Sequence, residues 1–194
     1  MKPYHHGDLR RSLLLAARQL LEESGPAALN LREIARRVGV SAPSAYHHFA
    51  SLDAIAVALA EQGYAELAER LDAALTAAGS GPLAPMGEAY IAFARANPGL
   101  YRLMFGEGFR VASAESKAVR ALRQRTNASL RAGLQGRVPE GDVPATALYL
   151  WSLTHGLALL MIDGQTDHAA DPEAAIRAVL RLAGTGLPPS ATRR

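Results

Sequence analysis

The chain has 194 residues, of which 49% are hydrophobic and 20% charged, and its formal net charge is +3. This balance is typical of a globular protein of one or two domains and excludes collagen-like, disordered and disulfide-stapled classes. The absence of cysteine excludes disulfides, thiolate nucleophiles and cysteine metal sites. The N-terminal residues lack the apolar stretch of a secretory signal, so we expect a cytoplasmic protein.

The excess positive charge lies near the N-terminus. Residues 1–50 contain seven Lys and Arg against four Asp and Glu, whereas the remaining residues contain fourteen of each. A basic N-terminal segment on a neutral body favours a polyanion as the partner. The alternative is a solvated, arginine-rich face without a partner.

Apolar residues recur at helical spacing through nearly the whole chain, which predicts an all-α fold of about nine helices. The first expected helix spans residues 8–24 and stops at Gly25-Pro26. A second helix begins at the N-cap Asn30, where Glu33 can complete a capping box, and it ends at Gly39.

A third short helix is expected at residues 41–49, with Ser41 as its N-cap, and a long helix follows at residues 51–78. The remaining helices are expected at residues 85–96, 98–105, 114–135, 143–163 and 172–183. The most apolar stretch, residues 145–162, is too short and too polar for a clean membrane span. We interpret it as a buried helix.

Two short helices joined by a tight turn predict a helix-turn-helix, whose second helix lies in the DNA major groove. If Val40, Ala45 and Phe49 face inward, the other side chains of this second helix can contact bases and phosphates. These outward residues are Ala42, Pro43, Ser44, Tyr46, His47 and His48. The alternative for the Tyr-His-His run is a packed aromatic helix end, but Arg32 and the basic start of the first helix favour DNA.

Residues 4–64, with YHHGDLR at 4–10, LREIARRVGVS at 31–41 and AYHHF at 45–49, resemble the DNA-binding domain of TetR-family transcriptional regulators. The resemblance implies an all-α homodimer that binds a palindromic operator, usually represses, and releases DNA when a small-molecule effector binds. It assigns DNA contacts to Arg32, Pro43, Ser44, Tyr46, His47 and His48. The chain departs from the family at Leu52, where members commonly carry a lysine that touches phosphate, so we expect phosphate contacts from Tyr46, His48 and the N-terminal arm.

The segment WSLTHG at residues 151–156 resembles the C-terminal domain of a TetR subgroup named for its Trp-His-Gly pattern. A purely structural role for the Trp-His pair in the core is the alternative. The family forms its dimer through the last two helices. This implies an interface that contains Trp151, Leu159, Ile162, Ile176, Val179 and Leu180.

Large side chains of the C-terminal half are candidates for an effector pocket with a few polar groups. They are Tyr90, Phe93, Tyr101, Met104, Phe105, Phe109, Trp151 and His155. We therefore expect a helix-turn-helix domain at residues 1–50, a connecting helix at 51–78, an effector-binding and dimerisation domain at 79–184 and a flexible tail at 185–194.

An enzyme is not expected, because the sequence contains no glycine-rich phosphate loop, GxSxG or HExxH motif. We expect no cofactor, and no metal site either, since neighbouring histidines on a helix point away from each other. The competing hypothesis is a helical ligand-binding or protein-interaction module whose helix-turn-helix no longer reads DNA. Leu52 is the feature that favours this alternative.

Overall fold

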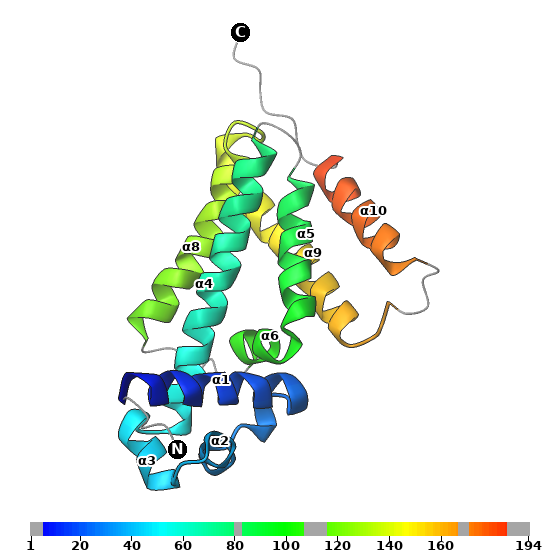
Figure 1. Cartoon of the computed structure of the whole chain (residues 1–194). Coiled ribbons are helices and arrows are strands. Elements are labelled where there is room, and N and C mark those ends of the chain that lie inside the picture. The colour runs from blue at the N-terminus through cyan, green and yellow to red at the C-terminus, as the bar shows by residue number, and fades with distance from the viewer. Residues whose placement is uncertain (1–5, 80–82, 107–115, 167–170, 186–194) are drawn as a thin grey trace. The chain divides into compact units, whose positions relative to one another are not determined.

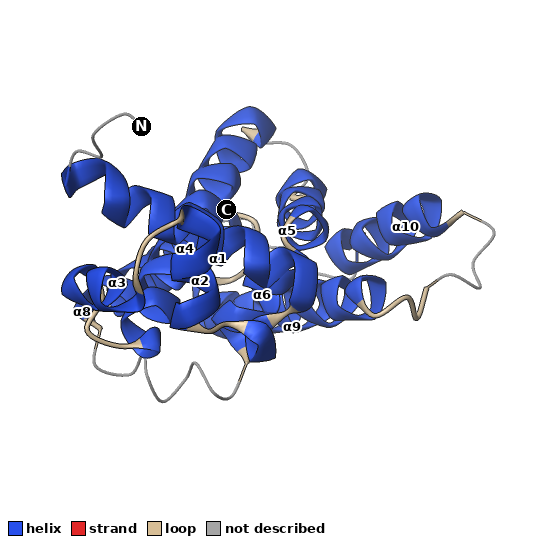
Figure 2. Cartoon of the chain, turned by 60° about the horizontal axis from the view of Figure 1, so that its bottom comes forward, coloured by secondary structure: helices blue, strands red, loops and turns tan. Residues whose placement is uncertain are grey.

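A computed structural model describes residues 6–79, 83–106, 116–166 and 171–185 (Figure 1). These residues form nine α-helices and two short 3-10 helices, and no strand occurs among them (Figure 2). The α-helices are α1 (His6–Ser24), α2 (Leu31–Val38), α3 (Ala42–His48), α4 (Leu52–Ala78), α5 (Ala84–Ala96), α6 (Pro98–Phe105), α8 (Lys117–Leu134), α9 (Val143–Ile162) and α10 (Pro172–Thr185). The 3-10 helices are η1 (Pro26–Ala28) and η2 (Glu140–Asp142). The predicted all-α class is confirmed.

Local capping explains where the early helices begin. The side chain of Asn30 accepts a hydrogen bond from the Glu33 amide at 3.0 Å, and Ser51 Oγ accepts one from the Ala54 amide at 3.1 Å. Each bond satisfies an amide that the first turn of a helix leaves without a partner. At the end of α2, Gly39 adopts a φ of 79°, a left-handed conformation that glycine reaches without steric cost.

The chain divides into two compact units. Unit 1 contains residues 1–64 and 97–121, and unit 2 contains residues 65–96 and 122–194. The helices α4 and α8 contribute residues to both units. The helix α6 belongs to unit 1 together with the helix-turn-helix, although α5, which precedes it in the chain, belongs to unit 2.

The core of unit 1 is formed by the inner faces of α1 to α4 and α6. Leu13, Leu21, Ile34 and Ile55 are fully buried in it. Removing each such side chain from water contributes about 1.5–3 kcal/mol. The apolar face of α1 is buried in this core, and α1 packs against α2 and α3.

The helices α4 and α6 approach closely in unit 1. A Cβ added to Gly63 would lie 2.5 Å from Met104 Sδ and 2.7 Å from Leu100 Cδ2. The buried Tyr64 hydroxyl donates to the Met104 carbonyl oxygen at 3.0 Å, and the Tyr64 ring packs edge-on to Phe105. Glycine at position 63 thus permits the contact that Tyr64 then stabilises.

Unit 2 is built from the second half of α4, α5, most of α8, α9 and α10. Its core includes a cluster of Leu134, Val138, Val143 and Ala147. On the surface, the Asp72 carboxylate accepts hydrogen bonds from Arg125 of α8, at 2.6 Å and 3.1 Å, and from Ser129. The Ser129 hydroxyl and then Arg125 hold the pKa of Asp72 below its ordinary value. These bonds tie α4 to α8.

Residues 145–162 form a helix that is only partly buried, so the prediction of a buried helix is correct for one of its faces and wrong for the other. The helix Glu140–Ile162 is long and apolar enough to cross a membrane by length and composition, yet only 22% of its most apolar window is buried. Leu148, Tyr149 and Leu160 are about half exposed. Within unit 2, α9 packs against α5 and α10, and these contacts leave Leu148, Tyr149 and Leu160 partly open to solvent.

Candidate nucleic-acid interface

The third helix of the chain, α3, presents a polar outer face. Of the three residues predicted to face inward, Ala45 is fully buried, Phe49 is 3% exposed and Val40 is half-buried, whereas Tyr46 is 53% exposed. Pro43 and His47 are also exposed, and Ala42, Ser44 and His48 are half-buried. The six side chains predicted to face outward therefore all lie at the surface or at its edge.

The turn between α2 and α3 is held by its own backbone. The amides of Gly39 and Val40 donate to the Arg36 and Ala35 carbonyl oxygens at 3.1 Å and 3.0 Å. Ser41 then caps α3, because its Oγ accepts from the Ser44 amide at 3.3 Å and lies 2.8 Å from Ser44 Oγ. The predicted contact residue Ser44 is thus also part of the helix cap.

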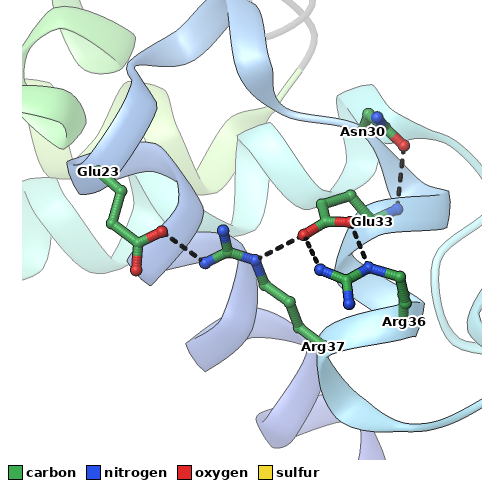
Figure 3. Close-up of polar contacts among 5 residues, drawn as sticks. All are labelled: Glu23, Asn30, Glu33, Arg36 and Arg37. Carbon is green, nitrogen blue, oxygen red and sulfur yellow. Dashed lines mark hydrogen bonds and ion pairs between the residues drawn. The ribbon is translucent and has the colours of Figure 1, made fainter.

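A network of charged side chains connects α1 with α2 (Figure 3). The Glu33 carboxylate accepts from Arg36 at 2.7 Å and from Arg37 at 3.0 Å, and Arg37 also pairs with Glu23 of α1 at 2.8 Å. The hydrogen bonds from Arg36 and Arg37 lower the pKa of Glu33 to about 2. Glu33 therefore does not complete the predicted capping box through Asn30, although Asn30 itself caps α2.

This network changes the predicted charge of the N-terminal segment. Arg36 and Arg37 are partly neutralised by Glu33 and Glu23. Arg32 lies exposed at the start of α2, and within the described part of the chain no hydrogen bond or ion pair engages it. Arg32 is therefore the cation of α2 that is most available to an anion.

Sequence reasoning missed two contacts that position α1. The Arg10 guanidinium lies 4.8 Å from the centre of the Phe49 ring, which joins α1 to the end of α3. Glu23 of α1 pairs with Arg37 at 2.8 Å, which joins α1 to α2. The i, i+4 spacing of Glu33 and Arg37 signals their pair, but nothing in the local sequence signals the contacts of Phe49 or Glu23.

The candidate effector residues fall in two units. Tyr101 and Met104 are buried in unit 1, where Tyr101 packs on the half-buried Phe105. Tyr90 and Phe93 are buried in unit 2. Phe109 lies outside the described residues.

Trp151, His155 and Tyr90 form one cluster in unit 2. Tyr90 Oη lies 3.0 Å from His155 Nδ1, and the Trp151 and His155 ring centres are 5.5 Å apart. Burial lowers the pKa of His155 below its ordinary value of 6.5. The lowered pKa favours the neutral imidazole at pH 7, and its Nδ1 forms a hydrogen bond with the Tyr90 hydroxyl.

A shallow groove of about 180 Å³ lies between α5 and α10. Its lining includes Ile91 and Ile176 together with Glu88 and Arg177, and Arg95 pairs with Glu173 beside them. None of the predicted pocket residues lines this groove. It is small and charged, unlike the mainly apolar sites that hold small molecules.

The residues predicted for a dimer interface divide into two sets. Ile176 and Leu180 are 4% and 6% exposed, and Leu180 lies where a Cβ of Gly87 would be, so both belong to the core of unit 2. Trp151 is 41% exposed, and Leu159, Ile162 and Val179 are half-buried. On α9 and α10, Leu148, Tyr149, Leu160 and Leu182 are also exposed apolar side chains.

Residues 83–183, just over half of the chain, match the family model described as "Tetracyclin repressor-like, C-terminal domain". Residues 13–59, which hold the helix-turn-helix described above, match the model of "Bacterial regulatory proteins, tetR family". The chain belongs to the TetR family. The predicted resemblance is confirmed, whereas the Trp-His-Gly subgroup stays a prediction.

A curated relative is named as a transcriptional regulator of the helix-turn-helix type. The chain is 28% identical over 96 residues to the uncharacterized HTH-type transcriptional regulator YobS of Bacillus subtilis (strain 168), a match to 49% of this chain and 50% of that protein. The chain thus spans about half the length of this curated relative.

Solved structures extend the likeness to nearly the whole chain. A protein of unknown function from Rhodococcus sp. RHA1 has a TM-score of 0.83 and 31% identity, covering 96% of this chain and 99% of that chain. The TetR-family transcriptional regulator PfmR from Thermus thermophilus has a TM-score of 0.69 and 24% identity, covering 90% of this chain and 98% of that chain. The second likeness shows a shared fold.

Proposed function

We propose that this TetR-family chain is a homodimeric transcriptional regulator that acts in the cytoplasm by binding a palindromic operator. The proposal rests on the helix-turn-helix formed by α2 and α3, which we call the reader. Ala45 in α3 and Phe49 at its end are buried, whereas Pro43, Tyr46 and His47 are exposed. A recognition helix must present such a surface to reach base edges and phosphates.

The contacts we propose follow from side-chain chemistry. Tyr46, His47 and His48 donate hydrogen bonds to phosphate oxygens, and Arg32 reaches a phosphate or a base edge. Ala42, Pro43 and Ser44 lie near the start of α3, where small side chains allow close approach to the bases. Leu52 provides no phosphate contact, so these residues and the start of α1 supply the anchorage.

Dimerisation is supported by the apolar surface that one chain leaves open. Leu148, Tyr149 and Leu160 on α9 and Leu182 on α10 are 48–70% exposed. Large apolar side chains exposed on neighbouring helices are typical of a protein–protein interface. We propose that a second copy covers it, with Trp151, Leu159, Ile162 and Val179 at its edges, and places two readers about 34–36 Å apart.

Regulation by a small-molecule effector is the remaining part of the proposal, with repression released on binding. It is supported by the fold shared with the multidrug binding protein EbrR complexed with imidazole, at 24% identity and a TM-score of 0.63 over the full length of both chains. Within unit 2, the Tyr90, Trp151 and His155 cluster offers the combination of aromatic and polar groups that recognises a small, largely apolar molecule. Phe93, which is buried in the same unit, is expected to line or support this site, whereas Tyr101, Met104 and Phe105 pack within unit 1.

Selection of bound sequences from a random duplex pool tests this function. The expected result is an enriched palindrome, whose complex weakens steeply as the salt concentration rises. No enrichment, with an affinity that does not change with salt, would favour a helical module whose helix-turn-helix no longer reads DNA.

A further inference from the structure

The helix α6 begins on a carboxylate that belongs to another helix. The Gly99 amide donates to Glu22 Oε2 at 2.7 Å, and the Leu100 amide donates to Glu22 Oε1 at 3.1 Å. Asn97 is the N-cap residue of α6, but its side chain forms no capping hydrogen bond with this helix. Glu22, near the end of α1, therefore satisfies two of the amides that the first turn of α6 leaves without a helical partner.

A second pair of contacts holds the same two segments. Arg18 donates to Asn97 Oδ1 at 2.6 Å and lies 3.4 Å from Glu22 one turn later on α1. Both side chains of α1 are only part-exposed, at 19% and 26%. Partial burial shields them from solvent, so these charge-assisted bonds are stronger than a pair on the open surface.

The backbones at this junction touch directly. A Cβ added to Gly99 would lie 2.2 Å from the Leu21 carbonyl oxygen and 3.0 Å from Glu22 Cα. Any other residue at position 99 would force α6 away from α1, because the obstructing atoms are main-chain atoms that cannot rotate aside. We name this set, Arg18, Glu22, Asn97 and Gly99, the α1–α6 joint. All four lie in unit 1, and α6 packs against α1 (Figure 1).

We propose that the α1–α6 joint sets the position of the helix-turn-helix for DNA reading, with Glu22 as its positioning residue. The inference rests on the proposed operator binding. α1 carries α2 through the Glu23–Arg37 pair and α3 through Arg10 and Phe49, so a shift of its last turn moves the reader. Residues 97–99 lie outside the segment that matches the DNA-binding family model, residues 13–59. If the proposal is correct, Asn97 and Gly99 influence operator affinity although they lie outside residues 13–59.

The test compares Glu22→Ala, Glu22→Gln and Gly99→Ala with two controls in the full-length protein. Gln19→Ala removes an exposed side chain from the same helix, and Gly184→Ala adds a methyl group where nothing lies within 4 Å. The operator is a duplex selected by the wild-type protein, and its Kd is measured well below the unfolding temperature. Hydrogen exchange of the Gly99 and Leu100 amides reports the state of the joint.

We expect Glu22→Ala to accelerate exchange at both amides and to raise the operator Kd about tenfold, which is the scale of one misread base pair, with the controls unchanged. Glu22→Gln retains one acceptor oxygen and gives an intermediate value, which is a rescue that loss of folded protein alone would not produce. Combining Glu22→Ala with Gly99→Ala adds little to the larger single effect, since both break the same joint.

An unchanged operator Kd for Glu22→Ala, with faster exchange of the two amides, would overturn the inference and leave the joint as a structural cap. Unchanged exchange would overturn it as well, because the capping bonds would then not hold α6. If the wild-type protein selects no duplex at all, the proposed function itself fails, and that outcome is distinct from both.

Discussion

Arg37 of α2 and Glu23 of α1 form an ion pair of 2.8 Å that ties the first helix of the helix-turn-helix to the helix before it. Arg37 also donates to Glu33 in its own helix, whereas Arg36 binds Glu33 alone. Arg37 is therefore the arginine that links two helices, and its neighbour is a natural control for it.

The Glu23–Arg37 pair predicts that removing the negative charge of Glu23 weakens operator binding, which is the opposite of what charge alone would do. Glu23→Gln removes a negative charge, and long-range attraction alone would tighten DNA binding. We expect a several-fold weaker operator affinity instead, because α2 loses its tie to α1. Gel-shift or anisotropy titration measures it, with Glu69→Gln, an exposed acid on α4, as the control. Tighter binding by Glu23→Gln would contradict a positioning role.

Tyr46 provides a test of the reading surface. Because its side chain is 53% exposed, Tyr46→Ala changes stability by no more than about 0.5 kcal/mol, yet it removes a proposed phosphate contact. We expect at least tenfold weaker operator binding with an unchanged dimer. Equal loss of dimer and of DNA binding in Tyr46→Ala would exclude the role assigned here.

Arg32→Gln should also weaken operator binding. The slope of log affinity against log salt concentration should fall by about 1, which is the contribution of one phosphate contact.

The exposed face of α9 predicts the oligomeric state. Leu160→Glu places a charge on a side chain that is 48% exposed, so the chain itself folds while a covering partner is repelled. Sedimentation should show monomers at concentrations at which the wild-type protein is dimeric. Leu15→Glu is the matched control, since Leu15 is 56% exposed on α1, outside the proposed interface. A persistent Leu160→Glu dimer would move the interface elsewhere.

His155 predicts a pH response that one fluorophore reports. Trp151 is the only tryptophan in the chain, and its ring lies 5.5 Å from His155, so protonation of the imidazole quenches its emission. Burial lowers the His155 pKa in the folded state, so the quenching midpoint lies below pH 6.5. A flat titration of the His155→Asn variant identifies the group. A wild-type midpoint above 6.5 would contradict burial as the cause.

The sign of the stability change follows from the same shift. The unfolded chain binds a proton at His155 more readily than the folded chain, so protonation favours unfolding. The stability contributed by neutral His155 is complete above pH 6.5 and is lost as the pH falls through the lowered folded value. The folded pKa of Glu33 is about 2, so the stability that its ionised carboxylate contributes is complete above pH 4.5 and is lost as the pH falls towards 2.

The sequence alone determined the elements and the face that each α-helix of the reader turns inward. Asn30, Gly39 and Ser41 mark boundaries because a cap needs only neighbours within three or four residues, and the structure reproduces each of them. The spacing of Ala45 and Phe49 settled the inner side of α3 in the same way. Such signals are local, so the linear chain contains them.

Only the tertiary structure decided which distant side chains meet. Ile176 and Leu180 read as interface residues in the sequence, yet both are buried against α5, and Leu182 on the same helix is exposed instead. The cap of α6 by Glu22 joins residues 77 positions apart, and no local pattern marks it. The physical reason is that a helical period fixes which residues share a face, whereas the partner of that face is chosen by the packing of the whole chain.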